Sequence, residues 1–396
     1  MTKKATVISV VVFILAVLLR NYEVLTGYEN SLTYLIPIAI SIGLFFHAID
    51  QYDTHNDCAE KPKFENLDFL RYFGAVLIVI LHLRPFKDIS YPLDLLFNNM
   101  ISRLFVPFFF ITSGYFVAKK QKQNPSYFKR YIKGLIPSYL IWCLIYLPFG
   151  LQYIKEMGLS PMLYPVGLIV GLLYSGTYYH LWYYPALIVA LLFTNAWLKR
   201  FKLSSLLVVS FLLFALGATE TYFGLLPNAI QTILNTYYYN IFITTRNFLF
   251  FGTFFVAMGY AIEAKNIVFA KASLTKLVVS FLLFLVEVML LQKVDRLDSN
   301  LMFMTIPTVF YMFTTALQLP FTIRMPFKES IREYYKYYYL IHPLIIYGVL
   351  ETIKPQTTLL GALLLTLVTL VLTHLTSWCF IQINRRYRTY KKKNSA

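Results

Sequence analysis

The feature that most constrains this chain is a succession of apolar segments, each long enough to cross a bilayer. A helix needs ~20 mostly apolar residues to span the hydrocarbon core of a membrane. Segments of that length fall near residues 5–26, 31–49, 65–86, 100–118, 134–152, 180–198, 204–221, 245–262, 276–292, 300–319, 335–352 and 358–382. The sequence therefore predicts an all-α fold, a polytopic bundle of about twelve transmembrane helices.

The charged side chains are too few for a water-soluble fold of this size. Only 14% of the 396 residues are Asp, Glu, Lys or Arg, whereas a soluble domain has roughly 25%. The net charge of +17 is carried by short clusters between the apolar segments, which is typical of the cytoplasmic loops of membrane proteins. We therefore expect a multi-pass protein of the cell membrane, surrounded by the lipid bilayer, and no nucleic-acid partner.

The distribution of basic residues also predicts the orientation. One further apolar run, 162–175, is short and interrupted by glycines, and we interpret it as a re-entrant or interfacial helix. About 26 of the 36 Lys and Arg residues then fall on the side of the N-terminus, so both termini are expected in the cytoplasm. The chain divides into two N-terminal spans with a cytoplasmic loop, a ten-span core and a basic cytoplasmic tail, at 1–63, 64–382 and 383–396.

The cysteines give little indication of chemistry. Cys58, Cys143 and Cys379 are the only three, and no two of them form a Cys-x-x-Cys pair. The sequence thus indicates neither a disulfide framework nor a metal site.

Ionisable residues inside apolar segments are the first candidates for function, because a charge is costly in lipid. In segment 65–86, Arg71 and His82 are eleven residues apart, which on a helix is three turns plus ~20° and roughly 16 Å along the axis. Both side chains therefore share one helix face, and Asp68, one turn before Arg71, can hold the guanidinium in place. The alternative is that Arg71 extends to the membrane interface and His82 is a boundary residue.

Two other ionisable residues in apolar segments are less informative. Glu287 lies in segment 276–292, and we expect it to be the buried partner of an arginine. We interpret His374 as an ordinary interior residue.

Five landmarks of the sequence resemble, in order, those of the membrane acyltransferase-3 family. They are Arg71 with His82 after ten intervening residues, the Phe-rich stretch from Arg103 to Ser113-Gly114-Tyr115, His180-Leu181-Trp182, Arg246 with a Phe-rich stretch ending at Gly259-Tyr260, and Tyr339-Leu340-Ile341-His342-Pro343. The resemblance extends over roughly residues 64–382. The five landmarks in this order are specific to the family, although the spacing between Arg71 and His82 alone would not be.

The resemblance implies transfer of an acyl group, commonly acetyl, from cytoplasmic acyl-CoA to a hydroxyl group of a cell-envelope glycan. Acyl-CoA, as acetyl-CoA, is then a co-substrate, and no cofactor or metal is bound permanently. Acyl transfer needs a base for the acceptor hydroxyl and positive charge for the oxyanion. We expect His82 to act as general base or transient acyl carrier, and Arg71 to bind the donor, so these two are the predicted catalytic residues.

The remaining candidates divide by their predicted depth in the membrane. Asp68 and Arg71 belong to the acyl-donor end, together with His342, which falls near the cytoplasmic end of segment 335–352. The predicted acceptor end consists of Arg103, His180, Trp182 and Arg246.

Two other functions remain open at this point. The same core also resembles the membrane domain of the membrane-bound serine racemases, which implies a membrane transporter of a small solute such as serine. Broken helices near the middle of the membrane would favour transport. The chain could also serve only as the anchoring subunit of an envelope-biosynthesis assembly, or function as a homo-oligomer.

Overall fold

The computed structural model describes residues 64–158, 160–242, 244–265, 273–318, 331–354 and 356–394. Within these ranges every regular element is a helix, which confirms the all-α prediction for the described part. The two predicted N-terminal spans lie outside the described residues. The chain divides into two compact units, one built on Pro107–Thr315 and the other on Lys61–Val106 together with Ala316–Ala396.

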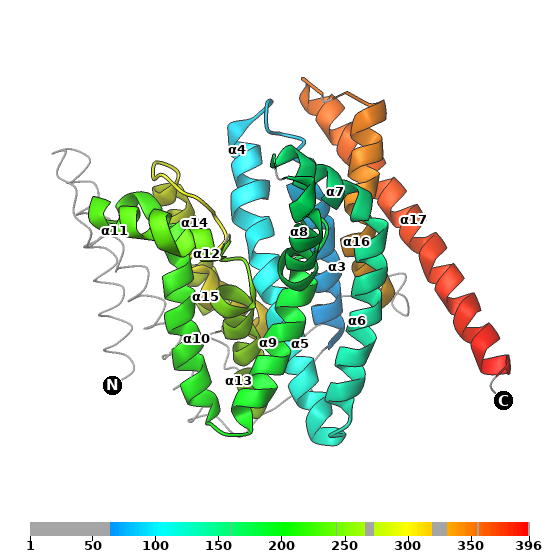
Figure 1. Ribbon diagram of the computed structural model, residues 1–396, viewed down its shortest axis with the longest axis horizontal. Coiled ribbons are helices and arrows are strands. Elements are labelled where there is room, and N and C mark those ends of the chain that lie inside the picture. Colours follow the sequence, from blue (N-terminus) through cyan, green and yellow to red (C-terminus); the bar gives the residue numbers. More distant parts are fainter. Residues whose placement is uncertain are drawn as a thin grey trace. The chain divides into compact units, whose positions relative to one another are not determined.

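The second unit joins segments from both ends of the described chain. Its helix α16 packs against both α3 and α17 (Figure 1). The helical elements of this unit are α3 (Phe64–Leu83), α4 (Tyr91–Asp94), η2 (Leu95–Ile101), η3 (Ser102–Leu104), α16 (Ile331–Thr352) and α17 (Leu359–Asn394).

Helix α3 ends sharply. Arg84 follows its last residue with a positive φ of 47°, the left-handed conformation that commonly terminates helices. Pro85 comes next and cannot donate a backbone hydrogen bond to continue the helix. The guanidinium of Arg84 pairs with Asp94 at 2.6 Å between Nη2 and Oδ2, which closes the loop before η2.

The first unit contains the intervening helices. Its centre is α13, in which every residue from Thr253 to Ile262 is buried, as expected for a helix that is apolar on all sides. The elements are α5 (Phe105–Gln123), α6 (Tyr127–Ile145), α7 (Leu147–Glu156), η4 (Pro161–Leu163), α8 (Tyr164–Val170), η5 (Gly171–Ser175), α9 (Tyr183–Leu198), α10 (Leu203–Gly217), η6 (Ala218–Glu220), η7 (Phe223–Leu225), α11 (Asn228–Ile233), η8 (Leu234–Tyr238), α12 (Tyr239–Phe242), η9 (Phe248–Gly252), α13 (Thr253–Ala264), α14 (Ser273–Leu291) and α15 (Thr305–Gln318).

Two glycines allow α5 and α13 to touch backbone to backbone. A Cβ atom on Gly114 would overlap the carbonyl oxygen of Val256, and one on Gly259 would overlap that of Ile111. Small residues at such crossings are typical of helix packing in membranes. The two glycine landmarks of the sequence therefore have a packing role.

Helix α17 has the polarity expected of a helix in lipid. It buries a stripe of hydroxyl side chains, and Thr366, Thr369 and Thr373 each donate to the carbonyl four residues earlier, at 2.7–2.8 Å, so these polar groups are satisfied within the helix. Up to Ile383 its exposed side chains are apolar, and they include Leu360, Leu363, Leu364, Leu367, Val371, Leu375 and Trp378. Because an aqueous surface would reverse this arrangement, the exposed face fits contact with lipid tails.

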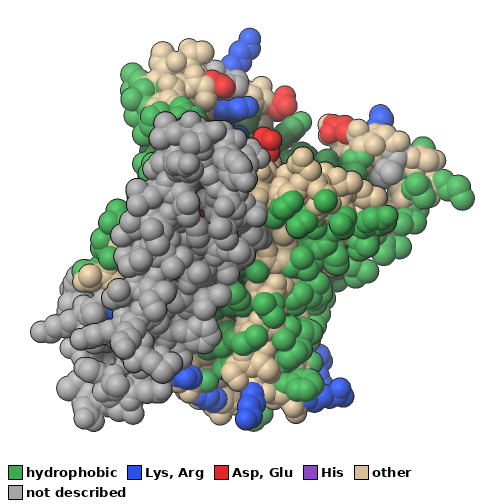
Figure 2. Space-filling view, turned by 90° about the vertical axis from the view of Figure 1, so that its left-hand side faces the viewer, with side chains coloured by type: hydrophobic (Ala, Val, Ile, Leu, Met, Phe, Trp, Pro, Cys, Tyr) green, Lys and Arg blue, Asp and Glu red, His purple; other side chains and the backbone are tan. Residues whose placement is uncertain are grey.

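The surface of the described chain has the same character. In Figure 2, hydrophobic side chains cover much of the coloured part of the face, and Lys and Arg side chains lie along its lower edge and at its upper end. An apolar surface bounded by basic residues is typical of a protein embedded in a bilayer.

Within the residues that the structure describes, five helical stretches are long and apolar enough to cross a membrane, and the bent pair α6–α7 would make a sixth. The five are Phe64–Leu83, Tyr91–Gln123, Leu203–Glu220, Leu274–Leu291 and Leu359–Tyr387. The chain is thus a helical membrane protein, whereas the number of twelve spans stays a prediction. The apolar run at 162–175 forms a short helical stretch, Pro161–Ser175.

Candidate active site

Arg71 and His82 form the predicted polar face of α3, and both contact one neighbouring helix, α16. The guanidinium carbon of Arg71 lies 4.3 Å from the ring centroid of Tyr335. Three turns further along, the imidazole of His82 stacks on that of His342, with 5.2 Å between the ring centroids and 24° between the planes. Both partners belong to α16 and are seven residues apart, which is about two helical turns. Arg71 and His82 therefore face the same side of α3.

Asp68 is shared by two arginines. Its buried carboxylate lies 3.5 Å from Nη1 of Arg71, one turn later on α3, and 2.8 Å from Nε of Arg332 at the start of α16. The two guanidiniums share one carboxylate, with Glu65 also close enough to interact with Arg332, and guanidiniums bind anionic groups such as phosphates. Arg332 was not among the sequence candidates, because it falls in a basic cluster that the orientation rule already explains.

His342 lies in the middle of α16, and not near one end of its span as the sequence analysis expected. The helix runs from Ile331 to Thr352, so almost equal lengths precede and follow the histidine. Its imidazole is fully buried, and Nδ1 is 2.9 Å from the carbonyl oxygen of Tyr338. A carbonyl only accepts, so Nδ1 carries the hydrogen and donates it.

His374 belongs to a hydrogen-bonded group in the same unit, which the interpretation as an ordinary interior residue did not foresee. Its Nδ1 lies 3.0 Å from the hydroxyl of Tyr338 and 3.4 Å from that of Tyr72. The two hydroxyls are 3.2 Å apart, and the ring of Tyr334 stacks on the imidazole at 4.4 Å. Helices α3, α16 and α17 are thereby joined between the level of Arg71 and that of His82.

The residues predicted for the acceptor end are divided between the two units. Arg103 belongs to the second unit, where its Nε donates to the carbonyl of Asn98 at 3.0 Å. His180, Trp182 and Arg246 belong to the first. The acceptor role of all four stays a prediction.

His180 and Trp182 lie among aromatic rings. His180 is 3% exposed, and its ring meets those of Tyr146, Tyr178 and Tyr179 edge to face at 4.7, 5.9 and 5.6 Å. Trp182 packs on Phe251 at 5.9 Å. Their nearest described contacts are therefore with the protein's own aromatic side chains.

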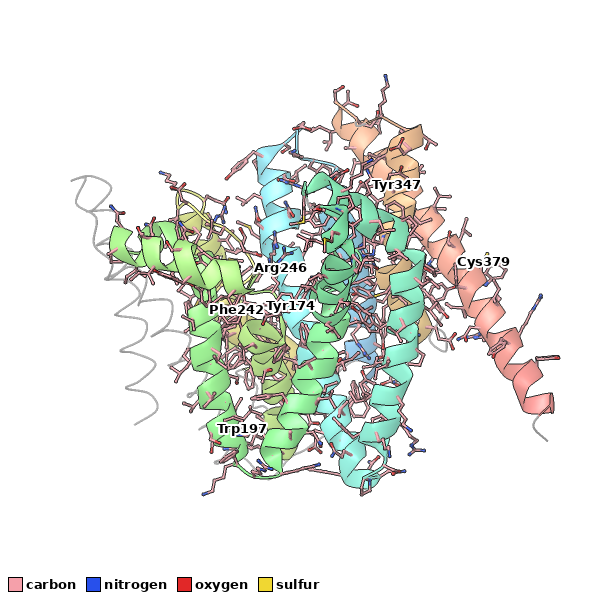
Figure 3. All side chains as sticks on the ribbon, viewed as in Figure 1. Tyr174, Trp197, Phe242, Arg246, Tyr347 and Cys379 are labelled. Atoms are coloured by element: carbon pink, nitrogen blue, oxygen red, sulfur yellow. The ribbon has the colours of Figure 1, made fainter. Side chains whose placement is uncertain are left out.

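Arg246 lies on a short non-helical stretch, Thr244–Asn247, that separates α12 from η9. Figure 3 shows it at the same level as Tyr174 and Phe242. The hydroxyl of Tyr174 donates to the carbonyls of Phe242 and Thr244 at 2.6 and 2.7 Å. At the end of the stretch, Asn247 accepts from the amides of the first helical turn, at 2.8 and 3.1 Å, which is the usual chemistry of a helix N-cap.

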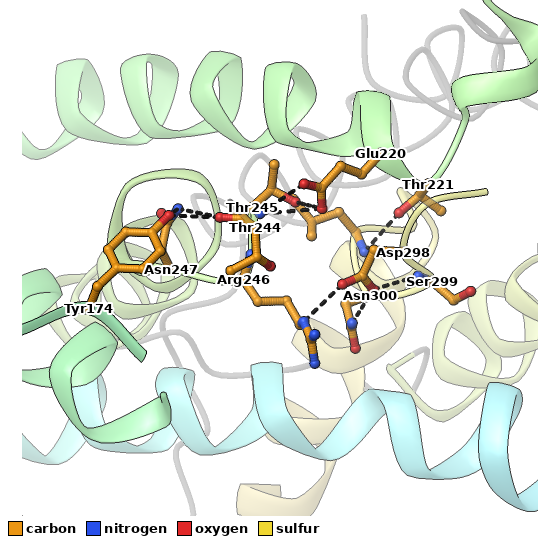
Figure 4. Close-up of polar contacts among 11 residues, drawn as sticks. Tyr174, Glu220, Thr221, Thr244, Thr245, Arg246, Asn247, Asp298, Ser299 and Asn300 are labelled. Atoms are coloured by element: carbon orange, nitrogen blue, oxygen red, sulfur yellow. Dashed lines mark hydrogen bonds and ion pairs between the residues drawn. The ribbon is translucent and has the colours of Figure 1, made fainter. Parts of the chain in front are cut away.

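Two acidic residues fix this stretch from the other side (Figure 4). Asp298 pairs with Arg246 at 2.8 Å between Oδ2 and Nε. Buried Glu220 accepts from the hydroxyl of Thr245 at 2.6 Å and from its amide at 3.2 Å. The backbone oxygen of Glu220 also accepts from the amide of Leu297 at 3.0 Å. Neither acid was a sequence candidate, because Glu220 falls at the end of the apolar segment 204–221 and Asp298 just before the segment 300–319, both without a local motif.

Glu287 has a structural role that the sequence analysis misassigned. It does not pair with an arginine in the described residues. Its carboxylate accepts from the backbone amides of Phe303 and Met304, both at 2.8 Å, and from the hydroxyl of Tyr222. These amides precede α15, so a buried carboxylate on α14 caps the start of that helix. Across the described residues, no group of three His, Cys, Asp or Glu side chains could hold a metal ion.

A family model described as an acyltransferase domain matches residues 64–378. The match extends across both units and covers all five landmarks of the sequence analysis.

Similar proteins carry racemase names. A serine/alanine racemase of Enterococcus gallinarum is 31% identical over 330 residues, which is 78% of this chain and 45% of that protein. An amino-acid racemase of Enterococcus faecalis is 27% identical over 345 residues, which is 84% of this chain and 48% of that protein. The chain thus covers less than half the length of these relatives. No solved structure matches it.

Proposed function

Because the chain belongs to the acyltransferase-3 family, we propose that it is an integral membrane O-acyltransferase. It moves an acyl group, acetyl in the simplest case, from cytoplasmic acyl-CoA to a hydroxyl group of a cell-envelope or extracellular polysaccharide. In this proposal the protein lies in the cell membrane with both termini in the cytoplasm.

The observation that carries the proposal is the common partner of Arg71 and His82. Arg71 lies over Tyr335 and His82 stacks on His342, so both ends of the polar face of α3 contact α16. Such a pair offers a cation for the donor at one depth and an imidazole for proton transfer at another.

The proposed reaction assigns each group a step. His82 accepts the proton of the acceptor hydroxyl while the oxygen attacks the thioester carbonyl of acyl-CoA. The carbon–sulfur bond then breaks, an ester forms, and the leaving thiolate takes the proton from His82. At the other end, Arg71 and Arg332 bind the phosphate groups of CoA, with Asp68 between them fixing their positions.

The proposal is tested by replacing His82 with Ala and measuring O-acyl groups on the surface polysaccharide by mass spectrometry. We expect no acylation above the level of a strain without the gene, because the base is lost. The matched control is His374→Ala, which removes another imidazole of the same unit and should preserve acylation. Full acylation by the His82 variant at normal membrane levels would remove His82 from the reaction.

Transport of a small solute is the second candidate, and one observation favours it. The break at Thr244–Asn247 places Arg246 and the capped start of a helix on unwound backbone, a combination that transporters use to bind carboxylates. The relatives are named for amino acids, one of them for serine and alanine. Uptake of labelled serine into proteoliposomes in the absence of acyl-CoA would favour this candidate, and acyl transfer without uptake would exclude it.

A further inference from the structure

We propose that His342 is a positioning residue for His82, holding the His82 ring by stacking and stabilising its protonated form. The inference rests on the proposed function, since it takes His82 as the group that receives the proton. It assigns His342 to the reaction centre, whereas the sequence analysis placed it at the donor end.

The His342 ring is itself held in place. It is buried, and Nδ1–H donates to the Tyr338 carbonyl of its own helix at 2.9 Å. Pro343 follows, and a proline inside a helix leaves the carbonyl four residues earlier without its helical donor. That carbonyl belongs to Tyr339, beside the one that His342 already contacts. The His-Pro pair thus fixes both the position and the tautomer of the imidazole.

The fixed imidazole of His342 lies against that of His82. The planes are 24° from parallel and the centroids are 5.2 Å apart. His82 is partly exposed, so its own surroundings confine it less than those of His342. The stack therefore limits how the His82 ring can turn, which restricts where its nitrogens point.

The contact between the two rings also affects the charge that His82 gains in the reaction. When His82 takes the proton of the acceptor hydroxyl it becomes a cation, and His342 presents a neutral aromatic face to it. Attraction between a cation and an aromatic face persists at partly exposed sites such as that of His82, although it is strongest away from water. Because the cation exists only after proton transfer has begun, this contact stabilises the transition state and raises kcat with little effect on KM.

Two substitutions separate stacking from a purely structural role. His342→Phe keeps a flat ring but loses the hydrogen bond to Tyr338. His342→Asn keeps a donor close to the position of Nδ1 but loses the ring. If stacking matters, kcat should fall about tenfold or more in the Asn variant and less in the Phe variant, with KM for acyl-CoA within about twofold of the original. The reverse order would mean that only the helix hydrogen bond matters and would overturn the inference.

The matched control is His374→Phe. It keeps the stack on Tyr334 and loses a hydrogen bond to Tyr338, so it reports general damage to the same helices. Its kcat is expected to stay within about twofold of the original. An equal loss of kcat in this variant and in His342→Asn would attribute both to packing and overturn the inference.

A second measurement does not depend on activity. Nitrogen NMR of histidine-labelled protein in nanodiscs identifies which ring nitrogen carries the proton, and each of the six histidines is assigned by substitution. We expect the Nδ1–H tautomer for His342, and a shift of the His82 signals in His342→Asn that is absent in His374→Phe. Unchanged His82 signals would overturn the inference even if acyl transfer is confirmed. If no acyl transfer is found, the proposed function fails, while the NMR result still decides whether His342 holds His82.

Discussion

Among the residues of the second unit, Asp68 combines burial with more than one charged partner. Its carboxylate is buried and serves two arginines, one from its own helix and one from a segment 264 residues away. Removing one member of a buried ionic group is costly, because the remaining charges keep their desolvation without their partner. Asp68 is therefore expected to matter for stability as well as for the positions of the two guanidiniums.

We predict that Asp68→Asn lowers the free energy of unfolding by about 1–3 kcal/mol, a value reduced because the side chain of Arg332 is 62% exposed and solvent screens its pair. The melting temperature in detergent measures this loss. The control is Arg385→Gln, which breaks the pair with Glu333 at 3.4 Å, where the carboxylate is 29% exposed against 8% for Asp68, and should cost less than about 1 kcal/mol. Equal losses in the two variants would contradict the special role of Asp68.

Residues with a local pattern could be predicted from the sequence, and residues paired over long distances could not. The eleven-residue spacing placed Arg71 and His82 on one face, and three residues brought Asp68 beside Arg71, as the structure has them. Nothing near Arg332 in the sequence indicates that it pairs with Asp68. Such contacts depend on how α3 and α16 pack, which spacing along one helix does not determine.

At the scale of elements, the helix crossing of α5 and α13 depends on glycine. Gly114 of α5 lies against the backbone of α13, and Gly259 of α13 lies against the backbone of α5. Their resemblance to family landmarks therefore has a steric basis. A crossing this close has no room for a methyl group, because the atoms that would be displaced belong to the main chain.

We predict that Gly114→Ala or Gly259→Ala lowers the melting temperature by several degrees, since the helices must separate to admit the new Cβ. Folded yield and thermal unfolding in detergent provide the measurement. Gly134→Ala is the control: it lies inside α6 with no atom within 4 Å of its added Cβ, and alanine favours a helix by roughly 0.5–1 kcal/mol over glycine. If neither Gly114→Ala nor Gly259→Ala changed the stability, α5 and α13 would not be in the close contact described above.

Most helices of the predicted core appear where the apolar segments indicated, but their ends follow local chemistry. The segment 134–152 was expected as one helix and is instead α6 and α7, bent by 60°, with a proline in the first turn of α7. The segment 245–262 begins its helix only at Phe248, because Asn247 caps it. Hydropathy averages over these positions, so it predicts that a helix exists better than where it ends.

At the scale of the whole molecule, the predicted membrane core is not continuous in the chain. Among the described residues, one unit is a single long segment, Pro107–Thr315, and the other is assembled from segments that precede and follow it. The hydropathy pattern treats each span separately and contains no information about which spans associate. The division into two units therefore could not be predicted from the sequence, whereas the all-helical membrane class could.

The predicted orientation gives a test by cysteine labelling. In a variant without native cysteines, Ser126→Cys lies in the exposed turn between α5 and α6, and Lys293→Cys is exposed after α14. A membrane-impermeant maleimide should label position 293 in intact cells, and position 126 only after permeabilisation, because alternation from a cytoplasmic N-terminus places them on opposite sides. Labelling of both in intact cells would contradict the predicted alternation of spans.

The proline after His342 has a mechanical consequence for α16. Pro343 removes the helical amide donor of the Tyr339 carbonyl, which interacts with the His342 imidazole instead, so one backbone hydrogen bond fewer links the two contacts of α16 with α3. Bending there would tilt one half of α16 while the other half stays docked. The turn of α16 around Pro343 thus decides whether Tyr335 and His342 can stay in contact with α3 at the same time.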